Sequence, residues 1–413
     1  MRIKRIAVIG AGPSGMMAAI RASQLNQSVT LFEKNSILGR KLLLSGKGRC
    51  NITNACSLDL FLKRFSKNGE FLRSAFAKFF NQDLIDFFKE RGLELKTERQ
   101  LRVFPVTDSS ASVVEVLKNE LIKNKVEVIY KTNIRNIIIE NGAVKGVVFE
   151  NGEFARFDLV IMATGGISYS FTGSSGEGLN IVKKAGHNII PLLPGLVPLE
   201  TKEGYPRDLE GLTLENIQLE FNSGKDEITS EVGDLLFTAF GVSGPLVITL
   251  SGKISDWLAQ KKEVSFKIDL KPGLTPEQLD ARLLREFKAN AKKGLKSVMK
   301  TLLPLRLVNL FIKMVKIAPD KKVNQITQKE RGELVSLLKG WKLNVKSVRP
   351  IEEGMITRGG VSLKEINPRT MESRLFKGLY FCGEMIDLDA DTGGFNLQAA
   401  FSTGYLAGES AAQ

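Results

Sequence analysis

The residues with the clearest chemical pattern stand near the N-terminus, where the run Gly10-Ala11-Gly12-Pro13-Ser14-Gly15 follows an apolar strand and precedes a good helix former. In this pattern the first glycine permits a tight turn, the second lets the backbone approach a pyrophosphate, and the third lets helix and strand pack closely. The helix N-terminus adds free N–H groups and the positive end of a dipole. The run therefore predicts a dinucleotide-binding strand–turn–helix unit.

A second apolar strand, Ser28 to Glu33, ends in a carboxylate. In such units an acid at this place binds the ribose hydroxyls of the dinucleotide. Glu33 would accept both hydroxyls and would repel a 2′-phosphate. The site therefore fits the adenosine ribose of FAD or NAD, with Lys34 beside it.

A basic loop, residues 39–54, follows this strand. Its four cations (Arg40, Lys41, Lys47 and Arg49) stand among small and amide side chains, a mixture that lets a loop wrap an anionic cofactor. The alternative interpretation is a solvated basic loop. The loop also contains Cys50, the sharpest catalytic candidate in the sequence.

The remaining cysteines, the single histidine and one acidic cluster suggest no metal site. Three cysteines without a CxxC favour a reducing compartment and no structural zinc. His187 excludes a site with two histidine ligands, and its place at an expected helix end favours a capping or surface role. Asp387, Asp389 and Asp391 lack the glycine and glutamate of a Ca²⁺ loop, so we expect turn residues or flavin contacts.

The elements around these residues predict an α/β fold. A helical excursion that includes Phe71 to Glu90 leads to a three-stranded meander and then to a strand ending in Ala163-Thr164-Gly165-Gly166. A strand at Gly378 to Glu384 and a helix start near Gly393 return at the C-terminus. This order predicts a two-dinucleotide-binding-type, Rossmann-like FAD domain. The meander strands are expected at Val126–Tyr130, Ile134–Glu140 and Ala143–Phe149, the last two joined by the turn signal Asn141-Gly142.

Two insertions interrupt the FAD domain, which we place at residues 1–190 and 346–413. Residues 191–273 are β-rich and predict a β-barrel-like domain, and residues 274–345 predict a basic helical domain with breaks near Pro304 and Pro319. No apolar run reaches the roughly 18 residues that span a bilayer, so we expect a cytoplasmic protein without membrane contact.

The positive charge is concentrated in the second insertion. The chain carries a net charge of +14, and residues 280–342 hold sixteen Lys and Arg against five acids, a local net charge of +11. Such a balance favours an anionic partner. A merely solubilising face is the alternative.

The motifs together resemble the BaiN/RdsA (YhiN-like) family of NAD(P)/FAD-dependent oxidoreductases, which includes ribosomal RNA dihydrouridine synthases. The resemblance rests on GxGPSG, GRKLLLSGKGRCNITN, RVFPVTDSSASVV, ATGG and GEMIDLDADTGGFNLQAAFSTG, in this order. It implies bound FAD, with NAD(P)H as electron donor. The cofactor residues that it implies are Gly10, Ala11, Gly12, Pro13, Ser14, Gly15, Glu33, Lys34, Arg40, Lys41, Ser45, Gly46, Asn51, Val128, Ala163, Thr164, Gly165, Gly383, Glu384, Asp387, Gly394, Phe395, Asn396 and Leu397.

Two features of the proposed chemistry stay open. Cys50 could donate a proton, act as a nucleophile, or pack as an inert thiol, and we expect Lys47 and Arg49 to lower its pKa. No second GxGxxG with a following acid is present, so NAD(P)H would visit the flavin transiently or another donor would replace it. The glycine-rich run 172–178 is either a phosphate loop or a plain helix entry.

Three functions follow as hypotheses: an FAD-dependent reductase of uridine in large-subunit ribosomal RNA, a reductase of a small unsaturated, steroid-like molecule, and an RNA-binding assembly factor that keeps FAD structurally. The basic helices favour the first. The sequence does not predict the oligomeric state. The expected RNA contacts are Arg49, Arg102, Lys292, Lys293, Lys296, Lys300, Arg306, Lys313 and Lys316.

Overall fold

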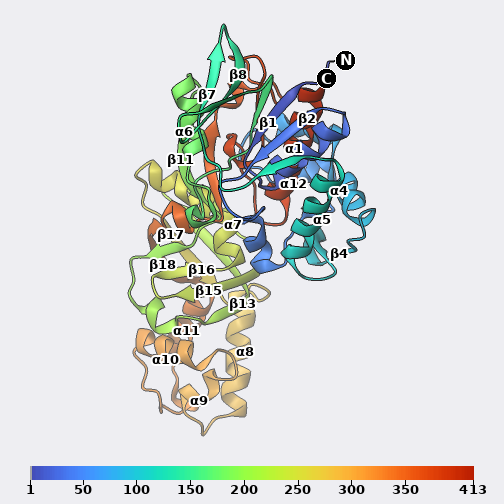
Figure 1. Cartoon of the computed structure of the whole chain (residues 1–413). Helices are drawn as coiled ribbons and strands as arrows, with labels where there is room; N and C mark the ends of the chain where they lie inside the picture. The colour runs from blue at the N-terminus through green and yellow to red at the C-terminus, as the bar shows by residue number, and fades with distance from the viewer. Residues whose placement is uncertain (1) are drawn as a thin grey trace. The chain divides into compact units, whose positions relative to one another are not determined.

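The computed structural model describes residues 2–413 and divides the chain into two compact units (Figure 1). The first contains the chain up to Gly195 together with Pro350–Gln413, and the second contains Leu196–Arg349. The predicted boundaries, 190/191 and 345/346, lie within five residues of these. The barrel-like strands and the basic helices, which we predicted as two domains, form one unit.

The first unit is built on a five-stranded parallel sheet with the order β20-β10-β1-β2-β6. Its central strand is covered on both faces, and Ile6, Ala7 and Val8 are fully buried, as the apolar run predicts. The strands are β1 (Arg5–Ile9), β2 (Ser28–Phe32), β6 (Glu127–Ile129), β10 (Leu159–Met162) and β20 (Leu379–Phe381).

Helices α1 and α12 lie against each other beside this sheet (Figure 1). A Cβ added at Gly404 or Gly408 of α12 would stand 2.2 or 2.3 Å from a carbonyl oxygen of α1, so only glycine permits this approach. The contact fixes the first and last elements of the unit side by side. The helices of the unit are α1 (Pro13–Gln24), α2 (Leu58–Leu62), α3 (Arg73–Lys78), α4 (Asn81–Lys89), α5 (Ser110–Lys123), α6 (Glu177–Ala185) and α12 (Phe395–Ala412).

Three small antiparallel sheets complete the unit. They contain β3 (Thr53–Asn54), β5 (Arg102–Pro105) and β4 (Leu95–Thr97); β7 (Ile134–Glu140), β8 (Ala143–Phe149) and β9 (Phe154–Arg156); and β11 (Ile189–Gly195) and β19 (Ile356–Val361). The predicted hairpin at Asn141-Gly142 is confirmed, and both residues have the positive φ that a two-residue turn of this type needs.

Three sequence expectations for this unit are wrong. The meander uses β9 as its third strand, because β6 instead joins the parallel sheet beside β2. The helix expected over Phe71 to Glu90 is interrupted at Phe79, whose extended backbone separates α3 from α4. The surface alternative for His187 is wrong: its side chain is 2% exposed, its Nδ1 lies 3.0 Å from a Glu365 oxygen and its Nε2 lies 3.1 Å from Ser373 Oγ. Its expected place at a helix end is confirmed, because it follows α6 and donates its backbone N–H to the Val182 carbonyl.

The second unit contains an antiparallel barrel, as predicted. Its sheet runs β14-β13-β15-β16-β12-β18-β17 and closes because β13 also pairs with β17. One helix of this unit, α7 (Pro245–Ala259), lies in the range that was expected to be β-rich, since its β-branched apolar start has no periodicity that separates helix from strand. The strands are β12 (Leu199–Thr201), β13 (Thr213–Ser223), β14 (Asp226–Thr229), β15 (Gly233–Thr238), β16 (Gly241–Ser243), β17 (Ser265–Asp269) and β18 (Trp341–Val348).

The basic helices lie between β17 and β18 in the chain and pack on the same core as the barrel. Capping boxes at Thr275 and Thr327 begin two of them, and Pro304 caps a third, so the predicted break there is confirmed. The helices are α8 (Pro276–Ala289), α9 (Leu295–Met299), α10 (Leu305–Val315) and α11 (Gln328–Gly340). Within residues 2–413, no helix is long and apolar enough to cross a membrane.

Candidate flavin-binding site

The glycine run forms a turn between β1 and α1 that leaves room for a ligand. A Cβ at Gly15 would stand 1.9 Å from the carbonyl oxygen of Gly10, so this position must be glycine for strand and helix to meet. A Cβ at Gly12 would meet nothing within 4 Å, and Gly12 also caps α1. The helix N-terminus therefore faces open space, which fits a pyrophosphate.

Glu33 is held at the end of β2 with its carboxylate fixed by three N–H groups. Its oxygens accept hydrogen bonds from the backbone N–H of Ala11 at 3.0 Å and from the backbone and side chain of Asn35 at 2.8 and 2.7 Å. The residue is 7% exposed. These bonds orient the carboxylate beside the glycine turn, where its remaining lone pairs suit ribose hydroxyls.

The cations next to Glu33 have polar partners within the chain. Lys34 Nζ contacts Ser175 Oγ at 2.7 Å and a Glu177 oxygen at 3.2 Å, and Arg40 donates to Asn35 Oδ1 at 3.1 Å. Val128 lies in β6, which pairs with β2. In the same strand the carbonyl of Ile129 accepts the backbone N–H of Glu33. The residues predicted to hold the adenosine half of the cofactor thus gather at one end of the parallel sheet.

Lys41 and Glu384 form the centre of a polar cluster that joins distant parts of the chain. Lys41 Nζ lies 2.8 and 2.6 Å from the two Glu384 oxygens and 2.6 Å from Ser168 Oγ. Glu384 also accepts the backbone N–H of Thr357 at 2.7 Å. Ser168 and Thr357 were not predicted, because neither belongs to a motif with a recognisable spacing.

The end of the basic loop and the helix α12 contain three buried polar side-chain atoms that have no partner within residues 2–413. These are Asn51 Oδ1, Thr53 Oγ1 and Gln398 Oε1. The backbone of Thr53 stands next to Gly394, the residue that begins α12. Since an unpartnered buried polar atom costs about 1–3 kcal/mol, a ligand with complementary groups would relieve this cost. The residues present therefore fit a flavin whose polar ring edge meets the N-terminus of α12.

Two residues that were predicted to contact the cofactor, Phe395 and Asn396, use their side chains for contacts within the protein. Asn396 binds the backbone N–H and carbonyl of Ala390 at 2.9 and 2.8 Å, so only its main chain remains for a cofactor. The buried ring of Phe395 packs edge-on against Phe61 at 4.7 Å between centroids. Their side chains hold the turn before the helix, and Leu397 is partly buried behind them.

The acidic cluster near the C-terminus is bound to basic and polar groups. Asp389 contacts Arg358 at 3.2 Å and Ser66 at 2.7 Å, and Asp391 contacts Arg64 at 3.5 Å. Asp387 is half-buried, and burial together with the charge of Asp389 raises the pKa of its carboxyl. In the described chain no group of three or more His, Cys, Asp or Glu is arranged to hold a metal ion.

The basic loop is folded tightly around Cys50. Lys47 and Cys50 have positive φ values of 58° and 59°, and Cys50 donates its backbone N–H to Ser45. The loop is fastened by Arg49, which contacts Glu98 and Asp108 and stacks over Phe104 at 4.3 Å. Arg49 therefore holds the loop in place. Because its charge is paired within the protein, the structure does not support the RNA contact that was predicted for it.

The expected lowering of the Cys50 pKa is wrong. Its side chain is fully buried, and this burial raises the pKa of the thiol to about 12, although a hydrogen bond with Ser45 opposes the shift. Neither Lys47 nor Arg49 contributes to this shift, and the Arg49 guanidinium is paired with Glu98 and Asp108. Cys50 stays protonated near pH 7, which suits a proton donor or a packing thiol and disfavours a nucleophile.

The predicted RNA contacts fall into two separate groups. Arg49 and Arg102 belong to the first unit, and Lys292, Lys293, Lys296, Lys300, Arg306, Lys313 and Lys316 belong to the second. Arg306 donates to the carbonyl of Glu210 at 2.8 Å. The other side chains of the second group have no hydrogen-bond or ion-pair partner within residues 2–413.

Comparison with known proteins gives the class. The fold, with a glycine turn, a ribose-binding acid and a returning C-terminal helix, is that of FAD-dependent oxidoreductases. The family described as the HI0933-like protein Rossmann domain matches residues 4–410, and the chain belongs to this family. The protein is accordingly an enzyme of the FAD-dependent oxidoreductase class, which leaves no support for a non-catalytic assembly factor.

Three curated relatives match almost the whole chain. A ribosomal RNA dihydrouridine synthase of Haemophilus influenzae is 32% identical over 96% of each chain. A protein of the same name from Escherichia coli is 30% identical over 96% of this chain and 95% of its own. A 3-dehydro-bile acid delta(4,6)-reductase of Clostridium scindens is 29% identical over 100% of both.

A solved structure supports the fold alone. The 3-ketosteroid-delta4-(5alpha)-dehydrogenase of Rhodococcus jostii RHA1 aligns with 99% of this chain and 97% of its own, with a TM-score of 0.51 and 14% identity. At this identity the likeness is one of architecture.

Proposed function

We propose that the protein is an NAD(P)H-linked, FAD-dependent reductase that converts uridine to dihydrouridine in large-subunit ribosomal RNA. Two relatives at 32% and 30% identity carry the name of this activity. A relative at 29% is named for a different substrate, so the names alone do not decide. The decision rests on the charged surface of the second unit.

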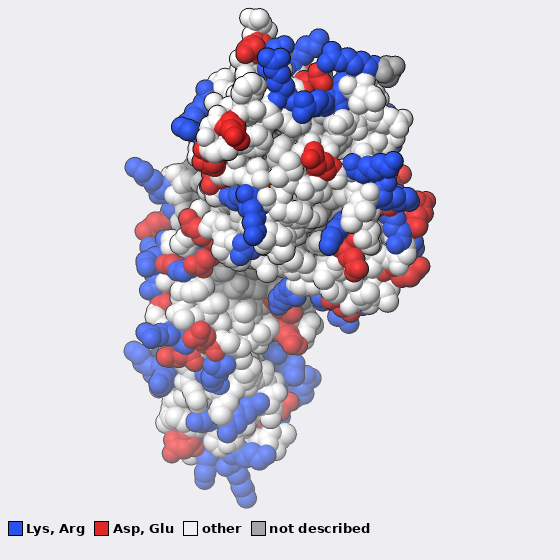
Figure 2. Space-filling view, viewed as in Figure 1, with Lys and Arg blue, Asp and Glu red and all other residues white. Residues whose placement is uncertain are grey.

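The observation that carries the proposal is a cluster of unpaired lysines on two joined loops. Backbone hydrogen bonds link Leu295 to Lys321 and Val323 to Lys293, so residues 292–296 and 319–323 lie side by side. We call these two stretches the basic tip. The side chains of Lys292, Lys293, Lys296 and Lys322 have no hydrogen-bond or ion-pair partner within residues 2–413, and Figure 2 shows Lys and Arg gathered over the inserted helices.

Unpaired, accessible ammonium groups of this kind suit phosphate oxygens. Each contact releases counterions from the nucleic acid, which gives affinity without reading sequence. A small steroid-like substrate would not use this surface. The basic tip would therefore hold the RNA backbone, and the target uridine would be turned out of its helix for the reaction.

The residues of the first unit would hold the cofactor and prepare the reaction. Bound and reduced FAD supplies a hydride to the C5–C6 double bond of the uracil ring. Gly12 and the start of α1 would bind its pyrophosphate, Glu33 its ribose, and the N-terminus of α12 would stabilise negative charge at the ring. The ion pair of Lys41 and Glu384 would provide polar groups beside the cofactor.

We keep Cys50 as the proposed proton donor. Burial raises its pKa to about 12 and keeps the thiol protonated, and exposure to a substrate would remove that burial and bring the pKa back toward the ordinary range in which a thiol gives up a proton. The thiol is buried, so it reaches a substrate only when the loop 45–50 shifts. The alternative is that the thiol only packs and that another group supplies the proton.

Reduction of a small unsaturated, steroid-like molecule remains the second candidate. It is favoured by the relative from Clostridium scindens, which matches the full length of both chains. Under this proposal the basic tip would be a solvated face without a role in turnover.

One experiment separates the two. Purified, FAD-loaded protein is incubated with NADPH or NADH and with ribosomal RNA from a strain that lacks the gene, and dihydrouridine is measured by mass spectrometry. The RNA proposal predicts that one site gains dihydrouridine and that the same site is unmodified in the deletion strain. An unchanged modification map in the deletion strain contradicts it. A parallel reaction with an unsaturated 3-ketosteroid tests the second candidate.

A further inference from the structure

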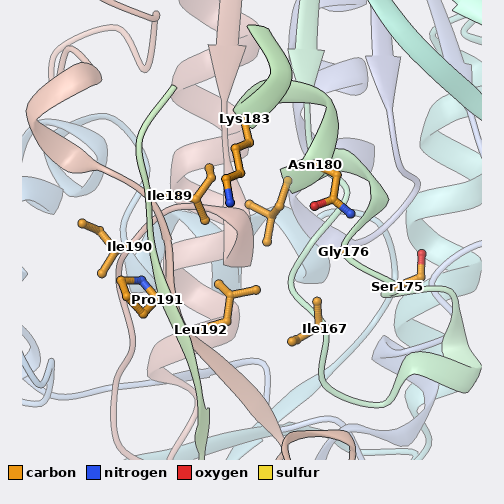
Figure 3. Close-up of a pocket in the computed structure, with 10 residues that line it drawn as sticks. Ile167, Ser175, Gly176, Asn180, Lys183, Ile189, Ile190, Pro191 and Leu192 are labelled. Carbon is orange, nitrogen blue, oxygen red and sulfur yellow. The ribbon is translucent and has the colours of Figure 1, made fainter. Parts of the chain in front are cut away.

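A cavity of about 400 Å³ opens in the first unit beside α6. No predicted flavin residue lines it, although its lining residue Ser175 lies 2.7 Å from Lys34 Nζ. Its walls come from Ile167, from α6 and the glycine-rich turn before it, and from the start of β11. Figure 3 shows Ile189, Pro191 and Leu192 along one side and Asn180 and Lys183 on the helix opposite. The cavity thus combines an apolar wall with a polar helix face.

Two polar side chains of the cavity, Lys183 and Asn180, are free to bind a ligand. The ammonium group of Lys183 points into the space beside Ile189 (Figure 3), and neither the Lys183 nor the Asn180 side chain has a hydrogen-bond or ion-pair partner in the described chain. Lys34, close to the same turn, instead forms an ion pair with Glu177 and donates a hydrogen bond to Ser175. Lys183 is therefore the single uncompensated charge of this cavity.

The lining also limits the kind of ligand. Ile167, Leu179, Ile189 and Leu192 offer apolar contact, and one ammonium group with one amide offers a match for a single anionic head. A dinucleotide carries several phosphates and would need more cations than the one that lines this cavity. The glycine-rich run 172–178 is therefore better described as a helix entry than as a phosphate loop.

We infer that this cavity binds a small organic monoanion, an apolar body that carries one carboxylate or similar group, with the head group on Lys183 and Asn180. None of the lining residues belongs to the set predicted to hold FAD. The site is nevertheless joined to it, because Gly178 of α6 packs directly against the side chain of Thr164 at the end of β10.

The test uses octanoate as the probe and FAD-loaded protein. Calorimetric titration should give one binding site for octanoate and none for octylammonium, which has the same chain and the opposite charge. Lys183→Met should weaken octanoate binding about threefold to fivefold, the range for an exposed charge pair. Lys184→Met is the matched control, because Lys184 follows Lys183 in the chain but does not line the cavity, and it should leave the affinity unchanged.

A second variant keeps the test independent of the first. Asn180→Asp places a carboxylate opposite the ligand head and should also weaken octanoate binding. The inference is overturned by the absence of binding, by equal binding of octylammonium, or by equal affinities of the Lys183 and Lys184 variants. Competitive displacement of octanoate by NADP⁺ would overturn it in favour of a nucleotide site.

Discussion

Two regions of this protein are rich in cations, and they use them in opposite ways. Around the predicted flavin site Arg49, Lys41 and Lys34 are each bound to acidic side chains. In the basic tip most lysine side chains have no partner within residues 2–413. Paired cations fix the positions of loops, whereas unpaired cations keep their charge available for a partner. Charge counts alone do not separate these two roles.

The largest expected effect concerns the space at Gly12. Gly12→Val adds a side chain where the protein has none within 4 Å, so the fold should persist while the place of the pyrophosphate is filled. We expect loss of bound flavin, measured as flavin absorbance per protein, with an unchanged melting temperature of the flavin-free protein. Gly15→Ala is the contrast, because its Cβ would collide with Gly10 and should destabilise the fold itself. A Gly12→Val protein that still purifies with full flavin content would contradict the proposed site.

The next effect concerns Cys50. Cys50→Ala should lower turnover by about 10²- to 10⁴-fold if the thiol donates the proton, while flavin content stays the same. Single-turnover reduction of the RNA checks this, and Cys50→Ser, which keeps a weak donor of similar size, should retain more activity than the alanine variant. Full activity in Cys50→Ala would leave Cys50 as a packing residue only.

The basic tip provides a more moderate test. Reversal of Lys292, Lys293, Lys296 and Lys322 to Glu should weaken RNA binding and reduce its dependence on salt by about one unit of slope for each phosphate that is no longer neutralised. Reversal of Lys89, Lys118, Lys145 and Lys225, exposed lysines outside the tip, changes the net charge equally and is the control. Equal effects of the two sets would show that the overall charge acts and not the tip. Reduction of a small steroid-like substrate should be the same in both.

The smallest effect concerns pH and a residue outside both cationic regions. Burial lowers the pKa of His187 below its ordinary value of 6.5, although Glu365 opposes the shift. The folded state therefore favours the neutral ring, and stability should be full above about pH 6.5 and should fall as the pH decreases below it. Thermal unfolding at pH 7.5 and 5.5 checks this. His187→Gln should show a smaller difference between the two pH values, and an unchanged difference would contradict the assignment.

The strand–turn–helix around Gly10 and the return at Gly383 could be predicted because their glycines have a fixed spacing and a physical reason at each position. The partners of individual side chains could not be. Arg49 was expected to contact substrate. Its ion-pair partners Glu98 and Asp108 lie 49 and 59 residues further along the chain, so the local sequence could not indicate them. The raised pKa of the Cys50 thiol and the burial of His187 likewise depend on neighbours that only the folded chain brings together.

In the second unit local pattern predicted a helical segment with a break near Pro304, because such signals act within one turn; the capping boxes at Thr275 and Thr327 are signals of the same local kind. It failed for α7, whose apolar residues satisfy the pattern of a buried strand equally well. The division into barrel and helices also differed, since both share one core that includes Trp341.

The route of the chain through the barrel has a consequence for how substrate choice could change between related enzymes. The basic helices leave the barrel after β17 and return at β18, and these strands are paired neighbours, with Ile268 opposite Trp341. The whole segment is thus topologically a long hairpin loop. Its length and its charge can change without any change in the order of the barrel strands. A chain with a short turn at this place would keep the closed barrel, but it would need a smaller, polar replacement for Trp341, whose ring the helix α10 now covers through Phe311.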